Sequence, residues 1–132
     1  MAERILIAIA IALLATLAVL AVRAWVNRRR RSTIGISAPN LATAGHATVL
    51  YFYSDTCEPC RTVQKPELDR LVQNTTNVIV RAIDAVAAPE LARAFKVLPV
   101  PTTVVLGPRG TVAAVNYGVA RVEKLVQQIS AA

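Results

Sequence analysis

An uncharged apolar stretch near the N-terminus limits the folds open to this chain more than any other feature. Residues Ile5 to Val22 contain no charged residue, glycine or proline, and Thr16 is the only polar side chain among these 18. A helix rises about 1.5 Å per residue, so roughly 20 apolar residues cross the roughly 30 Å hydrocarbon core of a bilayer. A buried core helix is the alternative, but such a helix normally has a polar face. We therefore predict a transmembrane anchor over residues 1–27.

The residues around this stretch favour a retained helix over a cleaved secretory signal. A signal sequence starts with basic residues and has an apolar region of about 7–15 residues before a small-residue cleavage site. Here Arg4 is offset by Glu3, the apolar region is longer than that range, and five arginines follow at Arg23 and Arg28 to Arg31. We expect an uncleaved, single-pass anchor in a bacterial-type cell membrane.

The net charge of +7 is concentrated beside the predicted anchor. From Ser32 onward, nine basic residues stand against seven acidic ones, a net charge of only +2. The arginines at Arg28–Arg31 predict contact with anionic lipid headgroups and, by the positive-inside rule, a soluble domain in the cytoplasm. An extracytoplasmic domain is the alternative. Nucleic-acid binding is not expected, because it requires basic residues among aromatic ones on a folded face.

Beyond the anchor, the apolar pattern predicts an α/β domain over residues 47–132, after a basic juxtamembrane segment and linker at 28–46. Runs of β-formers predict strands, and apolar residues spaced three or four apart predict helices. Strands separated by helices predict parallel pairing, and the final hairpin predicts an antiparallel edge. Pro66 predicts a kink or a reset of the helix. The order is β-α-β-α-β-β-α, with elements at Ala47–Tyr53, Cys60–Gln73, Asn77–Ile83, Pro89–Phe95, Thr102–Leu106, Thr111–Asn116 and Arg121–Ser130.

The only two cysteines lie three positions apart, as Cys57-Glu58-Pro59-Cys60, where the first predicted strand meets the first predicted helix. A helix N-terminus has unpaired N–H groups and about half a positive charge, which stabilise a thiolate at the first cysteine. The second cysteine is close enough to attack a mixed disulfide formed at the first. The pair therefore predicts a redox-active disulfide in which Cys57 attacks and Cys60 resolves.

Two other uses of the cysteines are less consistent with the sequence. Zinc takes about four ligands, whereas the chain offers two cysteines and the lone His46, so we expect no metal site. A structural disulfide across so short a loop stabilises a fold little. We expect no cofactor beyond the Cys57–Cys60 disulfide itself.

The cysteine motif has three companions that together resemble the thioredoxin family over about Thr48 to Ile129. They are Val100-Pro101-Thr102 before the third predicted strand, the turn at Gly107 to Gly110, and Gly118 before the last helix. The resemblance implies a thioredoxin-like fold with a mixed central sheet flanked by helices. It also implies thiol–disulfide exchange with protein substrates.

The same resemblance implies roles for residues around the cysteines. A cis peptide bond is expected at Pro101, which would pack against the cysteine pair, and the backbone of Val100 is expected to bind an extended substrate. The other residues expected to support the site are Thr56, Glu58, Pro59 and Thr102.

The chain departs from the family pattern at three positions close to the cysteines. Tyr51 stands where the family usually has a buried acid, Thr56 where it commonly has tryptophan, and Glu58 where it usually has glycine. The Glu58 carboxylate disfavours a thiolate at Cys57. The family's first strand and helix are also missing, replaced by the linker.

Two functions follow from these features. The intact cysteine pair favours a membrane-anchored oxidoreductase, and a cytoplasmic location favours protein-disulfide reduction over oxidation. The departures from the family pattern favour a non-enzymatic accessory subunit of a membrane complex, with the helix at Ile5–Val22 packed against other membrane helices.

Overall fold

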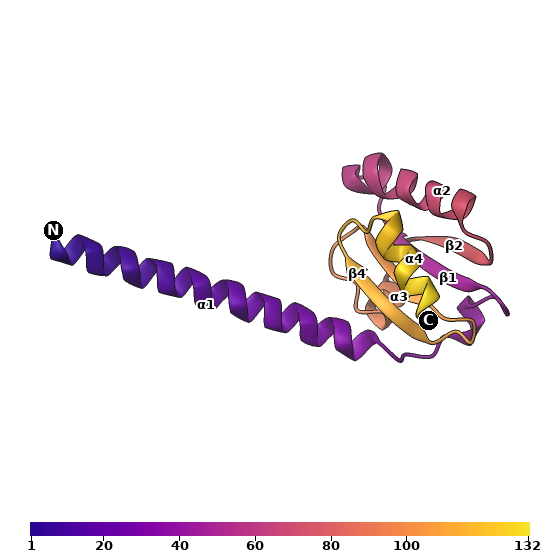
Figure 1. Cartoon of the computed structure of the whole chain (residues 1–132), viewed down its shortest axis with the longest axis horizontal. Coiled ribbons are helices and arrows are strands. Elements are labelled where there is room, and N and C mark those ends of the chain that lie inside the picture. Colours follow the sequence, from indigo (N-terminus) through magenta and orange to yellow (C-terminus); the bar gives the residue numbers. More distant parts are fainter. The chain divides into compact units, whose positions relative to one another are not determined.

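The computed structural model describes residues 1–132 and divides into two compact units, Met1–Arg31 and Ser32–Ala132 (Figure 1). The first unit is helical, as part of α1 (Ala2–Thr33). By length and composition this helix is able to cross a membrane, because its most apolar window has a mean hydropathy of 3.1 and none of that window is buried. The Arg29 guanidinium lies 5.5 Å from the ring centre of Trp25, a cation–π contact near the basic end of α1.

The second unit is built on a four-stranded sheet with the order β2-β1-β3-β4. All four predicted strands form, and the bounds of each are within one residue of the prediction. The strands are β1 (Ala47–Tyr53), β2 (Val78–Asp84), β3 (Thr102–Leu106) and β4 (Val112–Tyr117). The sheet is mixed: β1 and β2 are parallel, and β3 is antiparallel to both β1 and β4.

The direction of β3 corrects part of the predicted topology. Parallel pairing is confirmed for β1 and β2 but is wrong for β3, whose first residue, Thr102, pairs with Phe52 near the end of β1. The connecting helix, α3 (Pro89–Ala94), has six residues and therefore rises only about 9 Å. A seven-residue strand such as β2 spans about 23 Å. By itself α3 therefore does not return the chain along the whole strand, and β3 starts near the end where β2 finished.

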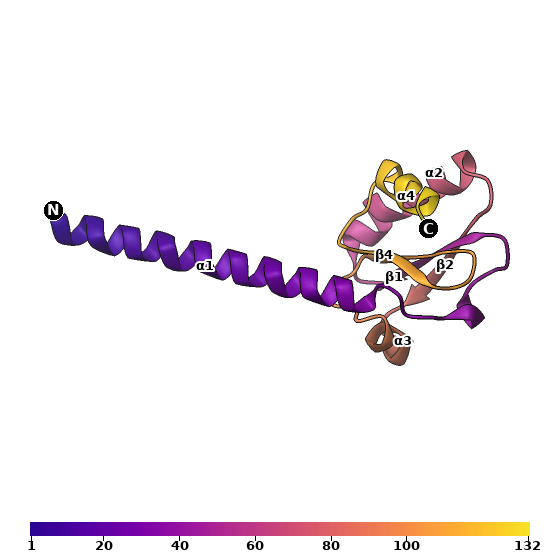
Figure 2. The same ribbon diagram turned by 60° about the horizontal axis from the view of Figure 1, so that its bottom comes forward.

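Helices cover both faces of the sheet (Figure 2). The helices α2 (Lys65–Asn74) and α4 (Val122–Ser130) lie on one face, and α3 lies on the other. Side chains of β1 alternate between two hydrophobic clusters: Val49 and Tyr51 pack under α2 and α4, and Leu50 and Phe52 pack on the α3 side. Because both faces of β1 are buried, its sequence is a continuous apolar run.

The first helix of the domain has an irregular start. The helical chain begins at Glu58, continues through a π-helical turn, η2 (Cys60–Gln64), and becomes regular at α2. The Lys65 N–H donates to the carbonyl of Cys60, five residues earlier. Pro66 has no N–H to donate to the preceding turn, and the wider π turn directly precedes it. The helix is therefore reset before Pro66 by a π-helical turn.

The segment expected to be a linker is packed against the domain. The Ala38 N–H donates to the carbonyl of Gly110 at 2.8 Å, and the Val112 N–H donates to the carbonyl of Ile36 at 2.9 Å. A short 3-10 helix, η1 (Pro39–Leu41), follows. Ile36 packs against the hydrophobic cluster on the α3 side, so the compact unit starts at residue 32 rather than at residue 47.

Thr48 provides a test of the packing of β1. Its side chain is fully buried, and its hydroxyl has no hydrogen-bond partner. A buried hydroxyl without a partner costs about 1–3 kcal/mol of stability. We expect Thr48→Val, which keeps the shape, to raise the free energy of unfolding by about 1 kcal/mol. Urea unfolding followed by the near-UV circular dichroism of the tyrosines measures this, with the exposed Thr76→Val as the control. A loss of stability in Thr48→Val alone would contradict the account.

Candidate active site

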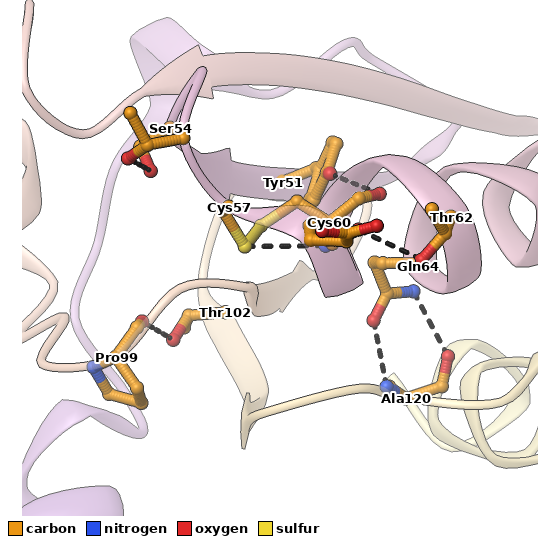
Figure 3. The surroundings of a disulfide bond; sticks show 11 residues. Tyr51, Ser54, Cys57, Cys60, Thr62, Gln64, Pro99, Thr102 and Ala120 are labelled. Atoms are coloured by element: carbon orange, nitrogen blue, oxygen red, sulfur yellow. Dashed lines mark hydrogen bonds between the residues drawn. A yellow bond between two sulfur atoms is a disulfide. The ribbon is translucent and has the colours of Figure 1, made fainter.

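The structure joins the two predicted redox cysteines in a disulfide (Figure 3). The Cα atoms of Cys57 and Cys60 are 5.3 Å apart. Cys57 ends the loop that leaves β1, and Cys60 opens the π turn of the following helix. The pair therefore lies at the strand-to-helix junction that the sequence indicates.

The two sulfur atoms have different surroundings. Cys60 is only 2% exposed and belongs to the hydrophobic cluster beneath α2 and α4, whereas Cys57 is half-buried and packs against that cluster from outside. The backbone N–H of Cys60 points to Sγ of Cys57 at 3.2 Å. In the reduced pair, this N–H and the helix N-terminus favour a negative charge on Cys57. Access and electrostatics thus both favour Cys57 as the attacking sulfur.

Tyr51 lies directly beneath the cysteine pair. Its hydroxyl donates to the backbone carbonyl of Cys60 at 2.9 Å, and its side chain is buried (Figure 3). Burial raises the pKa of Tyr51 above its usual value of 10.0, and the neighbouring Tyr53 raises that pKa further. The phenol therefore stays protonated at neutral pH. Tyr51 holds the main chain of Cys60 in place, and it does not accept a proton as a carboxylate in that position would.

The Val100–Pro101–Thr102 segment has the local geometry that the resemblance implies. The Val100–Pro101 peptide bond is cis. The carbonyl of Pro101 accepts from the Gly118 N–H at 2.9 Å, and the hydroxyl of Thr102 donates to the carbonyl of Pro99 at 2.7 Å. Val100 packs against the same hydrophobic cluster that contains Cys60. The segment and the cysteine pair therefore border one cluster, on the side of the sheet that α2 and α4 cover.

The other three predicted site residues are exposed beside Cys57. They are Thr56, Glu58 and Pro59. The Thr56 hydroxyl lies 3.5 Å from that of Ser54, and the backbone carbonyl of Glu58 accepts from the Thr62 hydroxyl at 2.9 Å. The Glu58 side chain takes part in no ion pair or hydrogen bond, so its carboxylate is open to solvent and to an approaching partner.

Two buried polar residues that the sequence reasoning missed hold the helix behind Cys60. The Gln64 amide donates to the carbonyl of Ala120 at 3.0 Å and accepts from its N–H at 2.8 Å (Figure 3). The Glu67 carboxylate accepts from the Val122 N–H at 2.8 Å and from the Arg121 guanidinium at 3.3 Å. Both residues therefore tie the helix of the cysteine pair to the start of α4.

The sequence contains a pattern that indicates burial of Gln64 and Glu67. Gln64 and Glu67 stand four and one positions before Leu68, on the helix face that also carries Leu71. Polar residues within an apolar stripe indicate buried polar contacts, because an unpaired polar group is costly to bury. The stripe alone does not identify the partners, which come from a distant part of the chain.

Glu67 should make the stability of the domain depend on pH. The hydrogen bond from the Val122 backbone, helped by Arg121, lowers the pKa of Glu67 below its usual 4.5 although burial opposes this. Because the folded pKa is below the unfolded value, the contribution to stability is present above about pH 4.5 and is lost as the pH falls through the folded pKa. We expect Glu67→Gln to lose less free energy of unfolding than the wild type between about pH 5 and pH 3. Urea unfolding at several pH values measures this, and equal slopes for the two proteins would contradict it.

Comparisons with protein families and with solved structures identify proteins that are similar to this chain. The family model described as Thioredoxin matches residues 39–131. Mitochondrial thioredoxin 3 from Saccharomyces cerevisiae, in its oxidised form, is 28% identical, with a TM-score of 0.61 over 71% of this chain and 86% of that one. Thioredoxin-2 of the malaria parasite, described as a component of its protein secretion machinery, is 27% identical, with a TM-score of 0.60 over 66% and 84%.

A thioredoxin mutant from Halobacterium salinarum is 25% identical, with a TM-score of 0.58 over 74% of this chain and 95% of that one. A search of curated protein sequences found no significant match. The matched family model covers the sheet, the helices α2 to α4 and the disulfide at the strand-to-helix junction. With a Cys57–Cys60 disulfide on a mixed four-stranded sheet, the chain belongs to the thioredoxin family.

Proposed function

We propose that this protein is a membrane-anchored oxidoreductase that exchanges disulfides with protein substrates, with protein-disulfide reduction as the favoured direction. One observation carries the proposal: the half-buried Sγ of Cys57 receives the Cys60 N–H at 3.2 Å, while Cys60 itself is buried. This asymmetry separates an attacking sulfur from a resolving one.

The reaction proceeds in two exchanges. In the reduced protein the Cys57 thiolate attacks one sulfur of a substrate disulfide, a mixed disulfide forms, and the other substrate sulfur leaves as a thiolate. The Cys60 thiolate then attacks Sγ of Cys57, and the second substrate sulfur leaves. The substrate disulfide gains two electrons, and the Cys57–Cys60 pair loses two. A thiol donor reverses these steps and returns the protein to its reduced form.

The residues around the pair bind the substrate chain in this proposal. The backbone of Val100 pairs with an extended substrate segment, and Thr56, Pro59 and Thr102 complete the surface around Cys57. The exposed Glu58 carboxylate raises the cost of a thiolate at Cys57. The thiolate at Cys57 is therefore disfavoured by the Glu58 carboxylate and favoured by the helix N-terminus.

The anchor places this chemistry at a membrane surface. Residues 1–27 form the anchor, the basic residues at 28–31 follow it, and the compact unit that starts at residue 32 carries the redox site. The length and hydropathy of α1 support the anchor. The arginines at Arg28–Arg31 support contact with anionic headgroups and, through the positive-inside rule, a cytoplasmic domain.

A redox titration tests the proposal. The full chain in detergent micelles is equilibrated in glutathione buffers, and its thiols are counted by alkylation, with the Cys57→Ser, Cys60→Ser double variant as the baseline. A reduction potential near about −270 mV supports a reductase, and one of about −120 to −180 mV supports an oxidant or isomerase. Failure to form the disulfide across the range would remove the enzymatic proposal in favour of an accessory subunit.

A further inference from the structure

The outer edge of β2 has no neighbouring strand, because β2 is the terminal strand of the order β2-β1-β3-β4. The edge runs for seven residues without proline or lysine, which natural proteins often use to block strand pairing. Arg81 and Ala82 are exposed at its centre. This edge therefore differs from that of β4, whose start is covered by the lead-in segment around residues 36–38.

The hydrogen bonds to β1 show which backbone groups of β2 point outward. The carbonyl of Asn77 accepts from the Ala47 N–H at 3.0 Å, and the Ala85 N–H donates to the carbonyl of Tyr53 at 2.8 Å. In a parallel pair, alternate residues of a strand direct both backbone groups to the same side. The backbone N–H and C=O groups of the odd-numbered residues of β2 therefore point toward β1. The residues whose N–H and C=O both face the free edge are Val78, Val80 and Ala82, because the carbonyl of the last even-numbered residue, Asp84, accepts from the Ala88 N–H at 2.9 Å.

The side chains of two of these residues line a groove of about 570 Å³ between α2 and the sheet. Its apolar lining comes from Tyr51, Tyr53, Leu68, Val80 and Ala82. The groove also borders Cys60 and the loop that leads to Cys57. The free backbone groups and the groove thus belong to the same stretch of β2, next to the redox site.

We propose that an extended segment of a partner protein binds along β2 as a fifth strand and places alternate apolar side chains in this groove. A strand repeats its backbone groups every two residues, or about 6.6–6.8 Å, which matches the spacing of the free groups of Val78, Val80 and Ala82. Strand addition to a sheet edge derives affinity from these backbone bonds and specificity from pockets for alternate side chains. A compact small molecule would leave most of the edge unpaired.

Charge defines the partner further. Arg81 is exposed on the opposite face of β2 from Val80, and it forms no ion pair. An acidic residue in the added strand, directly opposite Arg81, would pair with it across the strands. A second copy of this chain fits less well. Antiparallel pairing of two β2 edges would set Arg81 against Ile79, Arg81 or Ile83, and none of these offers an acid.

Amide hydrogen exchange tests the proposal with the oxidised full chain, labelled with ¹⁵N, in detergent micelles. The probe is the acetylated, amidated peptide Thr-Val-Glu-Val-Thr-Val-Thr, which has no thiol and so cannot react with the disulfide. Without it, we expect the amides of Val78, Val80 and Ala82 to exchange at least about ten-fold faster than those of Ile79 and Arg81. With the peptide in excess, we expect the outward-facing amides to be protected at least about ten-fold.

Two matched controls separate strand addition from other binding. A peptide with proline in place of the central valine should not protect these amides, because it lacks the required donor. The Arg81→Glu variant should bind the glutamate peptide about five-fold more weakly and should prefer the peptide that has lysine in place of glutamate. Arg81 is exposed, so this variant keeps the domain core intact.

Three outcomes would overturn the proposal. The first is no protection of the outward-facing amides at millimolar peptide. The second is equal binding of the proline peptide, which would mean a side-chain pocket without strand addition. The third is protection in the absence of peptide that increases with protein concentration, which would identify a second copy as the occupant. None of these readouts depends on thiol chemistry, so the proposed oxidoreductase function stands or falls separately.

Discussion

Serine at position 57 should abolish disulfide exchange, whereas serine at position 60 should trap the substrate. In Cys57→Ser the exposed nucleophile is lost and the buried Cys60, at 2% exposure, does not reach a protein disulfide. We expect the rate of insulin-disulfide reduction to fall at least about a thousandfold. In Cys60→Ser the first attack still occurs, but no sulfur resolves the mixed disulfide. Non-reducing electrophoresis of the full chain should show covalent adducts with Cys60→Ser and none with Cys57→Ser.

The control for both variants is Thr76→Ser, an exposed substitution after α2 that should leave the rate unchanged. Adducts that form equally with Cys57→Ser would reverse the assignment of the two sulfurs. Full activity in either serine variant would show that the disulfide is not the reacting group. A membrane complex that assembles at fixed stoichiometry and is indifferent to Cys57→Ser would favour the accessory-subunit alternative.

Gln64→Met should cause a large loss of stability for a single polar substitution. Methionine has a similar volume, but it leaves both the N–H and the carbonyl of Ala120 without partners, and Ala120 is only 1% exposed. Each of the two orphaned buried groups costs about 1–3 kcal/mol, so we expect the free energy of unfolding to fall by about 2–6 kcal/mol. Urea unfolding of the full chain, followed by the near-UV circular dichroism of the tyrosines, measures the change.

Gln73→Met is the matched control, because it replaces glutamine with methionine on the exposed side of α2. Its effect should lie within about 0.5 kcal/mol of zero. Equal effects of the two substitutions would mean that the backbone of Ala120 finds other partners and that Gln64 does not hold the helix behind Cys60 to α4.

Tyr51 changes the proton chemistry expected of the site. A carboxylate beneath the cysteines would be able to take the proton of Cys60 when that thiol resolves a mixed disulfide. The Tyr51 phenol, with its raised pKa, keeps its proton and donates a hydrogen bond to the Cys60 carbonyl. The Cys60 proton must then go to solvent or to the departing substrate thiolate. The rate of resolution in this protein should therefore follow the ionisation of its thiols.

Features that depend on neighbours along the chain were predictable from the sequence. The apolar stretch from Ile5 to Val22, the four strand positions, and the placement of Cys57 and Cys60 before a helix all follow from local patterns. Such patterns are readable because a helix or strand repeats every few residues, and a helix N-terminus acts on groups within its first turn.

Features that join distant parts of the chain were not predictable from the sequence and depend on the folded structure. Gln64 meets Ala120 across 56 positions, and β3 runs antiparallel to β1 because it starts near the end where β2 finished. The lead-in before β1 packs on the domain through backbone bonds to Gly110 and Val112. The free edge of β2 exists because no later segment of the chain pairs there. These contacts depend on which surfaces meet after folding, and no local spacing encodes that.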